Sequence, residues 1–223
     1  MKMIQWDFID KIIYINLEKR VDRRKHIEAE LKRVGVPEDK IIRFAAIEDT
    51  NGALGCAKSH LSALVMAQIN QWKNVLILED DMMFNTDPDI SERTNTFFRN
   101  LQNINWDVAF LSASYFIIKE RMDYTYKVEF AYLANSYIVQ RHYYQKLLHN
   151  YGQSVYLLEN GEKRNKAGID TNWMKLMSKD NWYGIYPCIG YQHTSMSDIE
   201  KVEVDRKRHF YRPISEIKRF GSY

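Results

Sequence analysis

The stretch Val75-Leu76-Ile77-Leu78-Glu79-Asp80-Asp81 decides the fold class of this chain. Its apolar run is short and bounded by polar residues, which is typical of a strand buried on both faces of an α/β sheet. The strand ends in three consecutive acids, and carboxylates at the edge of a buried strand repel one another and lose solvation. A divalent cation would compensate them, at the strand end where open parallel sheets bind ligands. A solvated polar turn is the alternative, and the triplet alone does not separate the two.

The residues before this strand predict a βαβ unit. Residues 11–17 are apolar and rich in β-branched residues, and they predict a first strand. Asp22 is expected to cap a helix that ends at Gly35 and Pro37. Residues 41–47 predict a second strand, and such a connection requires two parallel strands.

The rest of the chain alternates between helical and extended patterns. We expect helices over residues 56–71, 91–101, 142–149 and from Asp170 onward, and strands over residues 106–112, 137–139 and 183–189. Residues 115–130 suit a hairpin or an excursion from the main sheet, and the stretch 155–166 contains a polar loop over residues 159–166, a candidate mobile segment. The sequence predicts one domain over residues 1–205, followed by a basic, aromatic tail over residues 206–223.

Composition and charge are those of an ordinary globular protein. The net charge of +3 gives no reason to expect nucleic acid as a partner, although residues 19–25 and 206–219 form basic clusters. Two cysteines, Cys56 and Cys188, make neither a disulfide framework nor a metal-ligand spacing, so a reducing compartment is expected. The sequence shows no secretory signal and no apolar stretch of membrane-spanning length, which predicts a cytoplasmic protein.

Residues 52–59 come close to the phosphate-binding loop of nucleoside triphosphatases. Gly52-x-x-x-x-Ala57-Lys58-Ser59 differs in one residue from the loop pattern Gly-x-x-x-x-Gly-Lys-Ser. Ala57 replaces a glycine that the loop needs in order to wrap a phosphate. In addition, polar residues 48–51 stand where a buried strand should end directly. A P-loop enzyme is therefore the weaker interpretation.

Four stretches of the sequence, taken together, match the motifs of a known protein family. They are Ile13-Tyr14-Ile15-Asn16-Leu17-Glu18-Lys19-Arg20-Val21-Asp22-Arg23-Arg24, then Gly52-Ala53-Leu54-Gly55-Cys56-Ala57-Lys58-Ser59-His60-Leu61-Ser62, then the acid-tipped strand, and finally Asn135-Ser136-Tyr137-Ile138-Val139 with Asp170, Gln192 and Ser197-Asp198. In this order they resemble glycosyltransferase family 25, which includes lipooligosaccharide and collagen galactosyltransferases. The resemblance extends from residue 11 to about residue 200.

The resemblance implies a GT-A fold, in which a Rossmann-like mixed sheet flanked by helices binds a nucleotide-sugar, usually UDP-linked, together with Mn²⁺ or Mg²⁺. It implies an inverting hexosyltransferase, with galactose as the first donor sugar to test and glucose or N-acetylglucosamine left open. The implied acceptor is a hydroxyl of a glycan, of a lipid-linked glycan or of a collagen-like protein. The basic tail suits peripheral contact with an anionic membrane, although a plain solvated segment explains it as well.

The resemblance also assigns the acids to the metal. Asp81 is expected to ligate the cation directly, while Glu79 or Asp80 engages metal-bound water or ribose. Glu79 and Asp81 alternate along an extended chain and so can point the same way. His193 is the candidate third ligand.

The donor is expected to contact two further stretches. Asn16, Leu17, Arg20 and Arg23 follow the first strand, where arginine forks suit phosphate, and Lys58, Ser59 and His60 lie near a helix start, a natural anion site. Each has a plainer alternative. The basic turn can equally be the solvated start of a helix. His60 can be a core histidine whose hydrogen bonds are satisfied within the protein.

Inverting transfer needs a general base opposite the leaving group, and a carboxylate is the usual choice. Asp170 is the first candidate and Asp198 the second. Asp170 also suits a helix cap, so the two roles stay open. A domain that binds a nucleotide-sugar or a glycan without turning it over is the alternative from another functional class. The intact acid triplet favours catalysis.

Overall fold

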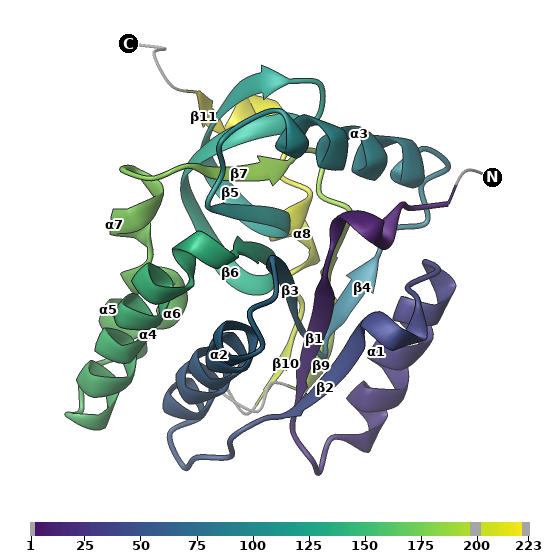
Figure 1. Ribbon diagram of the computed structural model, residues 1–223. Coiled ribbons are helices and arrows are strands. Elements are labelled where there is room, and N and C mark those ends of the chain that lie inside the picture. Colours follow the sequence, from purple (N-terminus) through teal and green to yellow (C-terminus); the bar gives the residue numbers. More distant parts are fainter. Residues whose placement is uncertain (1–2, 197–201, 220–223) are drawn as a thin grey trace.

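The computed structural model describes residues 3–196 and 202–219. A seven-stranded mixed sheet in the order β11-β5-β7-β6-β3-β1-β2 forms its centre, and helices cover both faces (Figure 1). The predicted fold class, a mixed α/β sheet of the GT-A kind flanked by helices, is confirmed.

The strands and helices have the following bounds. The central sheet contains β1 (Lys11–Asn16), β2 (Ile41–Ala45), β3 (Asn74–Glu79), β5 (Val108–Met122), β6 (Thr125–Gln140), β7 (Trp182–Ile185) and β11 (Lys218–Arg219). Two small sheets pair β4 (Met82–Phe84) with β8 (Gly190–Gln192), and β9 (Ser195–Met196) with β10 (Glu203–Val204). The helices are α1 (Val21–Arg33), α2 (Gly52–Ile69), α3 (Ile90–Gln102), α4 (Tyr144–Glu159), α5 (Arg164–Ala167), α6 (Ile169–Asn172), α7 (Met174–Met177) and α8 (Lys207–Phe210), with short 3-10 turns at η1 (Trp6–Phe8), η2 (Glu38–Lys40), η3 (Arg141–Tyr143) and η4 (Ile214–Glu216).

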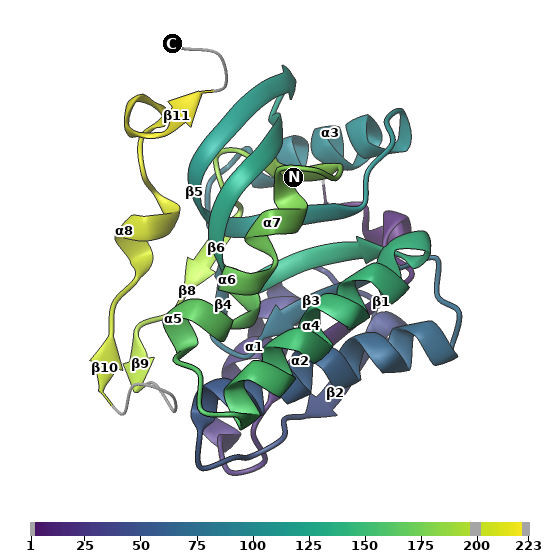
Figure 2. The same cartoon turned by 90° about the vertical axis from the view of Figure 1, so that its left-hand side faces the viewer.

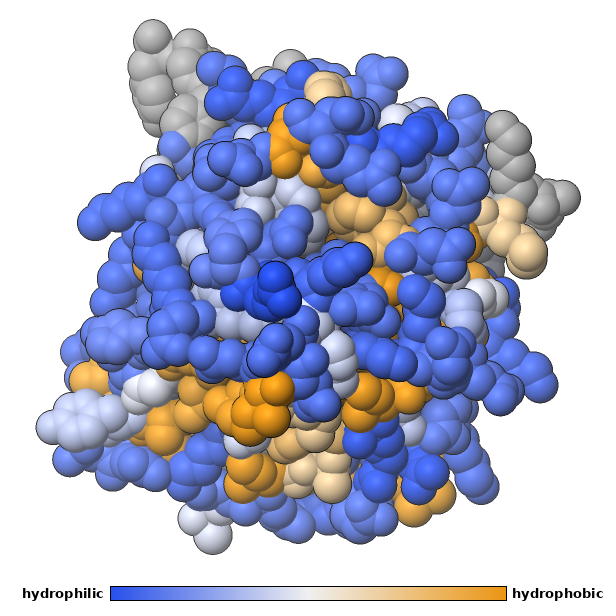
Figure 3. All heavy atoms as spheres, viewed as in Figure 1, coloured by the Kyte–Doolittle hydropathy of each residue, from blue (hydrophilic) through white to orange (hydrophobic). Residues whose placement is uncertain are grey.

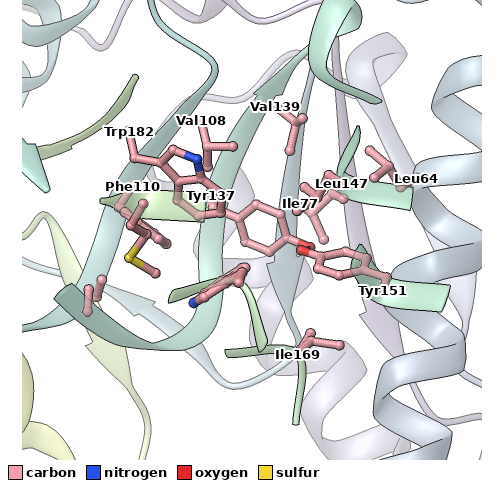
Figure 4. Close-up of a cluster of buried hydrophobic side chains, with 14 of the residues drawn as sticks. Leu64, Ile77, Val108, Phe110, Tyr137, Val139, Leu147, Tyr151, Ile169 and Trp182 are labelled. Atoms are coloured by element: carbon pink, nitrogen blue, oxygen red, sulfur yellow. The ribbon is translucent and has the colours of Figure 1, made fainter. Parts of the chain in front are cut away.

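The parallel strands β1, β2 and β3 form the predicted opening of the sheet. β1 lies between β2 and β3 and is parallel to both, and its side chains alternate between two hydrophobic cores. Ile13 packs with the core under α2 and α4, part of which Figure 4 shows, whereas Ile12 packs with the core under α1 and α3. Because both faces of β1 and β3 are buried, these two strands are apolar without alternation, and each buried Ile or Leu contributes about 1.5–3 kcal/mol.

Helix α2 begins at Gly52 and runs through the residues that resemble a P-loop. The Asn51 side chain caps it by accepting hydrogen bonds from the backbone N–H groups of Ala53 and Leu54. A Cβ on Gly55 would lie 2.6 Å from the carbonyl oxygen of Ile47, so only glycine allows this close approach to the segment after β2. Residues 52–59 are therefore helical rather than a phosphate-wrapping loop, which removes the basis of the P-loop interpretation.

The region predicted as a hairpin or excursion belongs to the main sheet. β5 and β6 form one long antiparallel hairpin with several register shifts, and β7 pairs with the start of each of the two strands. With 15 and 16 residues, β5 and β6 extend beyond the four residues of β7, and Figure 2 shows the two long strands curving together. The sequence underestimated the length of both strands because bulges interrupt the apolar alternation.

Two local predictions are wrong. Arg20, not Asp22, occupies the cap position of α1, and Asp22 lies in the first helical turn, where it accepts hydrogen bonds from the Arg20 guanidinium. Helix α4 continues to Glu159, and α5 starts at Arg164, so the polar loop predicted over residues 159–166 is limited to residues 160–163.

The C-terminal tail packs back onto the domain. β11 pairs in parallel with β5, and Phe210 and Ile217 are buried. Figure 2 shows this yellow segment running alongside the sheet, and Figure 3 shows a mainly hydrophilic face with scattered apolar patches. Among the helices of residues 3–196 and 202–219, none has the length and apolarity needed to cross a membrane.

Candidate functional site

A cavity opens where β1, β2 and β3 end, at the edge of the sheet where parallel strands place ligands. The acid triplet forms its floor. Its other walls come from the segments after β1 and β2, the start of α2, the short helices α5 and α6, the residues after β8, and the tail: Leu17, Lys19, Arg23, Ala46, Ile47, Glu48, Asp49, Gly52, Ala53, Gly55, Cys56, Ser59, His60, Leu133, Arg164, Gly168, Ile169, Asp170, Gln192, His193, Val204 and Arg206 among them.

Asp80 is fixed from two sides. Its Oδ2 accepts a 2.7 Å hydrogen bond from the Asn16 amide, and its Oδ1 accepts a 3.0 Å hydrogen bond from the Arg23 guanidinium. Burial raises the pKa of Asp80, while Arg23 and Asn16 work in the opposite direction. Asp80 therefore ties the end of β3 to the end of β1 and to the start of α1.

Glu79 is held as a carboxylate. Its Oε1 lies 3.3 Å from His60 Nε2, and its Oε2 accepts a 3.0 Å hydrogen bond from the Gln192 amide. Burial by itself raises the pKa of Glu79, but the hydrogen bonds from His60 and Gln192 outweigh it, so the net pKa is lowered. A carboxylate that accepts several hydrogen bonds is stabilised in its charged form.

Asp81 is the acid that lacks such support. Its Oδ1 is buried and has no hydrogen-bond partner among the described residues, while its Oδ2 lies 3.7 Å from the Arg23 guanidinium. Burial, followed by the charge of Glu79, raises the pKa of Asp81 well above its usual range. An orphaned buried carboxylate oxygen beside a second carboxylate fits a hard divalent cation, which prefers oxygen ligands.

The pairing of β4 with β8 brings the candidate third ligand to these acids. The backbone N–H of His193 donates a 2.7 Å hydrogen bond to the carbonyl oxygen of Asp81, and the side chain of His193 lines the cavity. Its ring centroid lies 4.8 Å from that of His26. Burial, with the nearby His26 and Arg23, lowers the pKa of His193, which favours the neutral imidazole that a metal requires.

Asp170 lies across the cavity on the short helix α6. Its Oδ2 accepts a 3.4 Å hydrogen bond from the backbone N–H of Leu133, a residue with the unusual φ of +70°. Burial and the charge of Glu79 raise the pKa of Asp170, while Arg164 opposes the rise. The N-cap of α6 is Gly168, so Asp170 does not serve as the helix cap.

The structure brings most of the predicted residues to one cavity. Those that line it are Leu17, Arg23, Ser59, His60, Glu79, Asp80, Asp81, Asp170 and His193. Asn16 does not line the cavity but holds Asp80. Arg20 pairs with Asp22, and Lys58 pairs with Asp49 and Glu159, so neither reaches the cavity as predicted. Asp198 lies outside the described residues.

Among the lining residues for which no role was predicted, three contribute a hydrogen bond or charge to the site. Gln192 contributes a hydrogen bond to Glu79, and Arg164 and Arg206 contribute positive charge. Arg164 falls in the segment read as a polar loop and Arg206 in the basic tail. Their charge was a visible signal, but their position in the site depends on how distant segments pack.

Searches of known proteins found similar sequences and structures. Over 101 residues, the chain is 32% identical to a Drosophila melanogaster protein described as Glycosyltransferase 25 family member; the match covers 34% of this chain and 16% of that protein, so the chain spans only a small part of its length.

Solved structures are similar at low identity. A mannose-1-phosphate geranyltransferase from Thermus thermophilus gives a TM-score of 0.48 at 11% identity, covering 83% of this chain and 74% of its own. A glycosyltransferase involved in glycosylation of the major capsid of PBCV-1 gives 0.40 at 10% identity, covering 78% and 92%. A Drosophila beta-1,4-galactosyltransferase 7 mutant in complex with manganese, UDP-Gal and xylobiose gives 0.33 at 11% identity, covering 62% and 52%.

The match to a protein family covers more than half of the chain. Residues 45–164 match the family described as Glycosyltransferase family 25 (LPS biosynthesis protein). This range contains the start of α2 and the acid triplet, which contribute many of the cavity-lining residues, and the β5–β6 hairpin, which contributes Leu133. The chain belongs to glycosyltransferase family 25.

Proposed function

We propose that this chain is a metal-dependent, inverting hexosyltransferase that moves a sugar from a UDP-sugar to a hydroxyl of a glycan acceptor. The observation that carries the proposal is the state of the acid triplet at the cavity floor. Glu79 and Asp80 each have hydrogen-bond donors that hold them, whereas Asp81 keeps a buried oxygen with no partner among the described residues. Family membership supports glycosyl transfer, and the acids support a cation as part of it.

The residues that would hold Mn²⁺ or Mg²⁺ are Asp81 and Glu79, with His193 as the third ligand. When bound there, the cation neutralises negative charge on the departing nucleotide. Asp80 does not ligate in this account. Because its two oxygens are engaged by Asn16 and Arg23, it keeps the end of β3 in place instead.

Two arginines supply positive charge for the donor diphosphate. Arg23 lies beside Asp80 and Asp81, and Arg206 lines the cavity from the tail and lowers the pKa of Asp81 through its charge. Arginine forks bind phosphate oxygens in pairs. Leu17 and Ala53 offer apolar cavity surface at the ends of β1 and the start of α2, where a base or ribose can pack.

Asp170 is the proposed general base, which takes the proton of the acceptor hydroxyl as that oxygen attacks the sugar. Its raised pKa brings it closer to neutral pH, where a base that is still ionised accepts a proton most effectively. The hydrogen bond from the Leu133 backbone fixes one of its oxygens, and Asp170 lines the cavity.

The proposed donor sugar is galactose, with glucose and N-acetylglucosamine as the next to test. The description of the family as an LPS biosynthesis protein supports a lipid-linked glycan as acceptor. The basic residues of α8 and its flanks support peripheral contact with an anionic membrane that carries it. A collagen-like hydroxylysine is the other acceptor to include.

The test of this function is a panel of UDP-sugars with Mn²⁺, in which released UDP and glycosylated acceptor are both measured. We expect turnover with one UDP-hexose and its loss when the metal is chelated. Turnover that survives chelation, or turnover of nucleoside triphosphates but of no UDP-sugar, would contradict the proposal.

The acid limb of the pH–activity profile, where activity falls as the pH is lowered, should report the protonation of Asp170. A base works only when ionised, so activity falls as pH drops through its pKa, and this limb should lie above the ordinary aspartate value of 3.8. Arg164→Gln removes the positive charge that holds the pKa down, so the limb should move to higher pH, by up to about one unit. Lys166→Gln, an exposed neighbour, is the matched control and should leave the limb in place. An unshifted limb in Arg164→Gln would exclude Asp170 as the titrating base.

A further inference from the structure

A chain of buried polar side chains leads from the hydrophobic core to the acid triplet. The hydroxyl of Tyr151 lies 2.9 Å from that of Tyr137, and Tyr137 lies 2.8 Å from Nδ1 of His60. The other ring nitrogen of His60, Nε2, lies 3.3 Å from Oε1 of Glu79. Figure 4 shows the two tyrosines with their hydroxyl groups facing each other among apolar side chains. His60 is 1% exposed and both tyrosines are 0% exposed, so these groups have no water to replace a lost partner.

The hydrogen atoms of this chain can be placed by counting donors and acceptors. A carboxylate side chain such as Glu79 only accepts hydrogen bonds, so Nε2 of His60 carries the hydrogen of the 3.3 Å contact with Oε1. If Nδ1 is bare, it accepts from the Tyr137 hydroxyl, whose oxygen in turn accepts from Tyr151, and every hydrogen in the chain has an acceptor. The arrangement therefore fits an imidazole that donates from Nε2 to Glu79 and accepts at Nδ1 from Tyr137.

Cys56 is a further polar neighbour of this pair. Cys56, His60 and Glu79 bring three ligand atoms within 4.8 Å of one another. The thiol of Cys56 lies 4.0 Å from Oε1 of Glu79, the same oxygen that His60 faces. His60 faces Glu79 as a hydrogen-bond donor.

We propose that His60 is a positioning residue for Glu79, and that the hydroxyl of Tyr137 holds His60 in the tautomer and orientation that this role requires. The inference rests on the proposed function, because it takes Glu79 as part of the cation site. It replaces the predicted direct contact of His60 with the donor. Hydrogen-bonding partners behind a ligating group orient it, and their loss commonly reduces metal affinity about 10- to 100-fold.

The two bonds on Glu79 show what the positioning achieves. His60 holds Oε1 from the α2 side, and Gln192 holds Oε2 from the β8 side. The carboxylate is thereby kept charged and fixed between two elements, with the remaining lone pairs available to the cavity. Without His60, only Gln192 and the Cys56 thiol, 4.0 Å from Oε1, would hold the group, so removal of His60 should weaken cation binding without emptying the site.

The first test reads the tautomer directly in the metal-free protein. Nitrogen-15 NMR of histidine-labelled protein distinguishes a protonated from an unprotonated ring nitrogen, and the His60 signals are assigned by their loss in His60→Gln. We expect Nε2 protonated and Nδ1 bare. In Tyr137→Phe the Nδ1 lone pair loses its donor, so the ring signals should change. Tyr151→Phe removes a buried hydroxyl of the same kind but leaves both bonds of His60, and the signals should keep the wild-type pattern.

The second test measures Mn²⁺ affinity in the presence of UDP. His60→Leu should weaken it about 10- to 100-fold. His60→Gln, whose amide can place an N–H near the position of Nε2, should recover most of the loss. Tyr137→Phe should weaken Mn²⁺ binding and Tyr151→Phe should not. A merely structural role would lower the melting temperature of both tyrosine variants alike and leave the affinities equal.

The outcomes separate this inference from the function on which it rests. A His60 whose Nε2 carries no hydrogen overturns the positioning role, and so does equal Mn²⁺ affinity in Tyr137→Phe and wild type. Either result, obtained with a wild-type protein that binds Mn²⁺ and UDP, leaves the proposed function standing. Absence of any Mn²⁺ binding in the wild type would instead overturn both.

Discussion

Asp81→Asn is expected to abolish metal-dependent sugar transfer while the protein stays folded. The amide keeps the shape of the side chain but removes the negative charge beside Glu79. Metal ions at such sites contribute several kcal/mol to transition-state stabilisation, so the loss in kcat/KM should be at least about 1000-fold. Mn²⁺ affinity should fall with it. Activity and Mn²⁺ titration on the same preparation measure both effects.

The melting temperature of Asp81→Asn tests whether the charge of Asp81 is unfavourable in the folded protein. The pKa of Asp81 is raised by burial and by neighbouring acids, which means that its ionised form is unfavourable in the folded protein. The melting temperature of Asp81→Asn at neutral pH should therefore equal or exceed that of the wild type. Asp7→Asn is the control, because Asp7 is exposed and belongs to η1, far from the cavity lining. Wild-type Mn²⁺ affinity in Asp81→Asn would show that this residue is not a ligand.

Asp170→Asn is expected to lower kcat about 100- to 10 000-fold, the usual contribution of a general base. Asp170 contacts the Leu133 backbone and lies on α6, away from the acid triplet along the chain. The affinities for Mn²⁺ and UDP should therefore change little, so the effect falls on turnover rather than on donor binding. Burst or single-turnover measurements with bound donor separate the two.

A fully active Asp170→Asn enzyme would require a different base. Asp198, the second candidate, would be the next residue to replace. Loss of UDP binding in Asp170→Asn would instead mean that Asp170 helps to build the donor site.

The sequence predicted the elements that depend on local pattern. The strand that ends at Glu79 is apolar on both sides because two helical layers cover the sheet, so it was identifiable without a structure. The position of the acids at a ligand-binding edge followed from the parallel order of β1 and β3. The long β5–β6 hairpin was not predicted in full, because its register shifts break the alternation that identifies strands.

Helix geometry explains why some residues of the α2 motif line the cavity and others do not. Cys56, Ser59 and His60 are three and four positions apart, so they share one face of α2 and line the cavity. Lys58 falls off that face and pairs with Asp49 and Glu159 instead. Membership of the motif did not determine orientation, whereas helical spacing did.

Other contributions depend on contacts between distant segments. Gln192 reaches Glu79 across 113 positions of the chain, and Tyr137 reaches His60 across 77. Arg206 enters the cavity because the tail folds back over the site. None of these distances is encoded in a local pattern, so a single sequence identifies the residue types without showing that they meet.

The most direct test of the account is calorimetric titration of UDP into the wild-type protein with and without Mn²⁺. If the acids at the end of β3 hold a cation that receives the donor diphosphate, UDP should bind tightly only when Mn²⁺ is present. Equal UDP affinity without the metal, or no UDP binding in either condition, would contradict the central claim that this cavity is a metal-dependent nucleotide-sugar site.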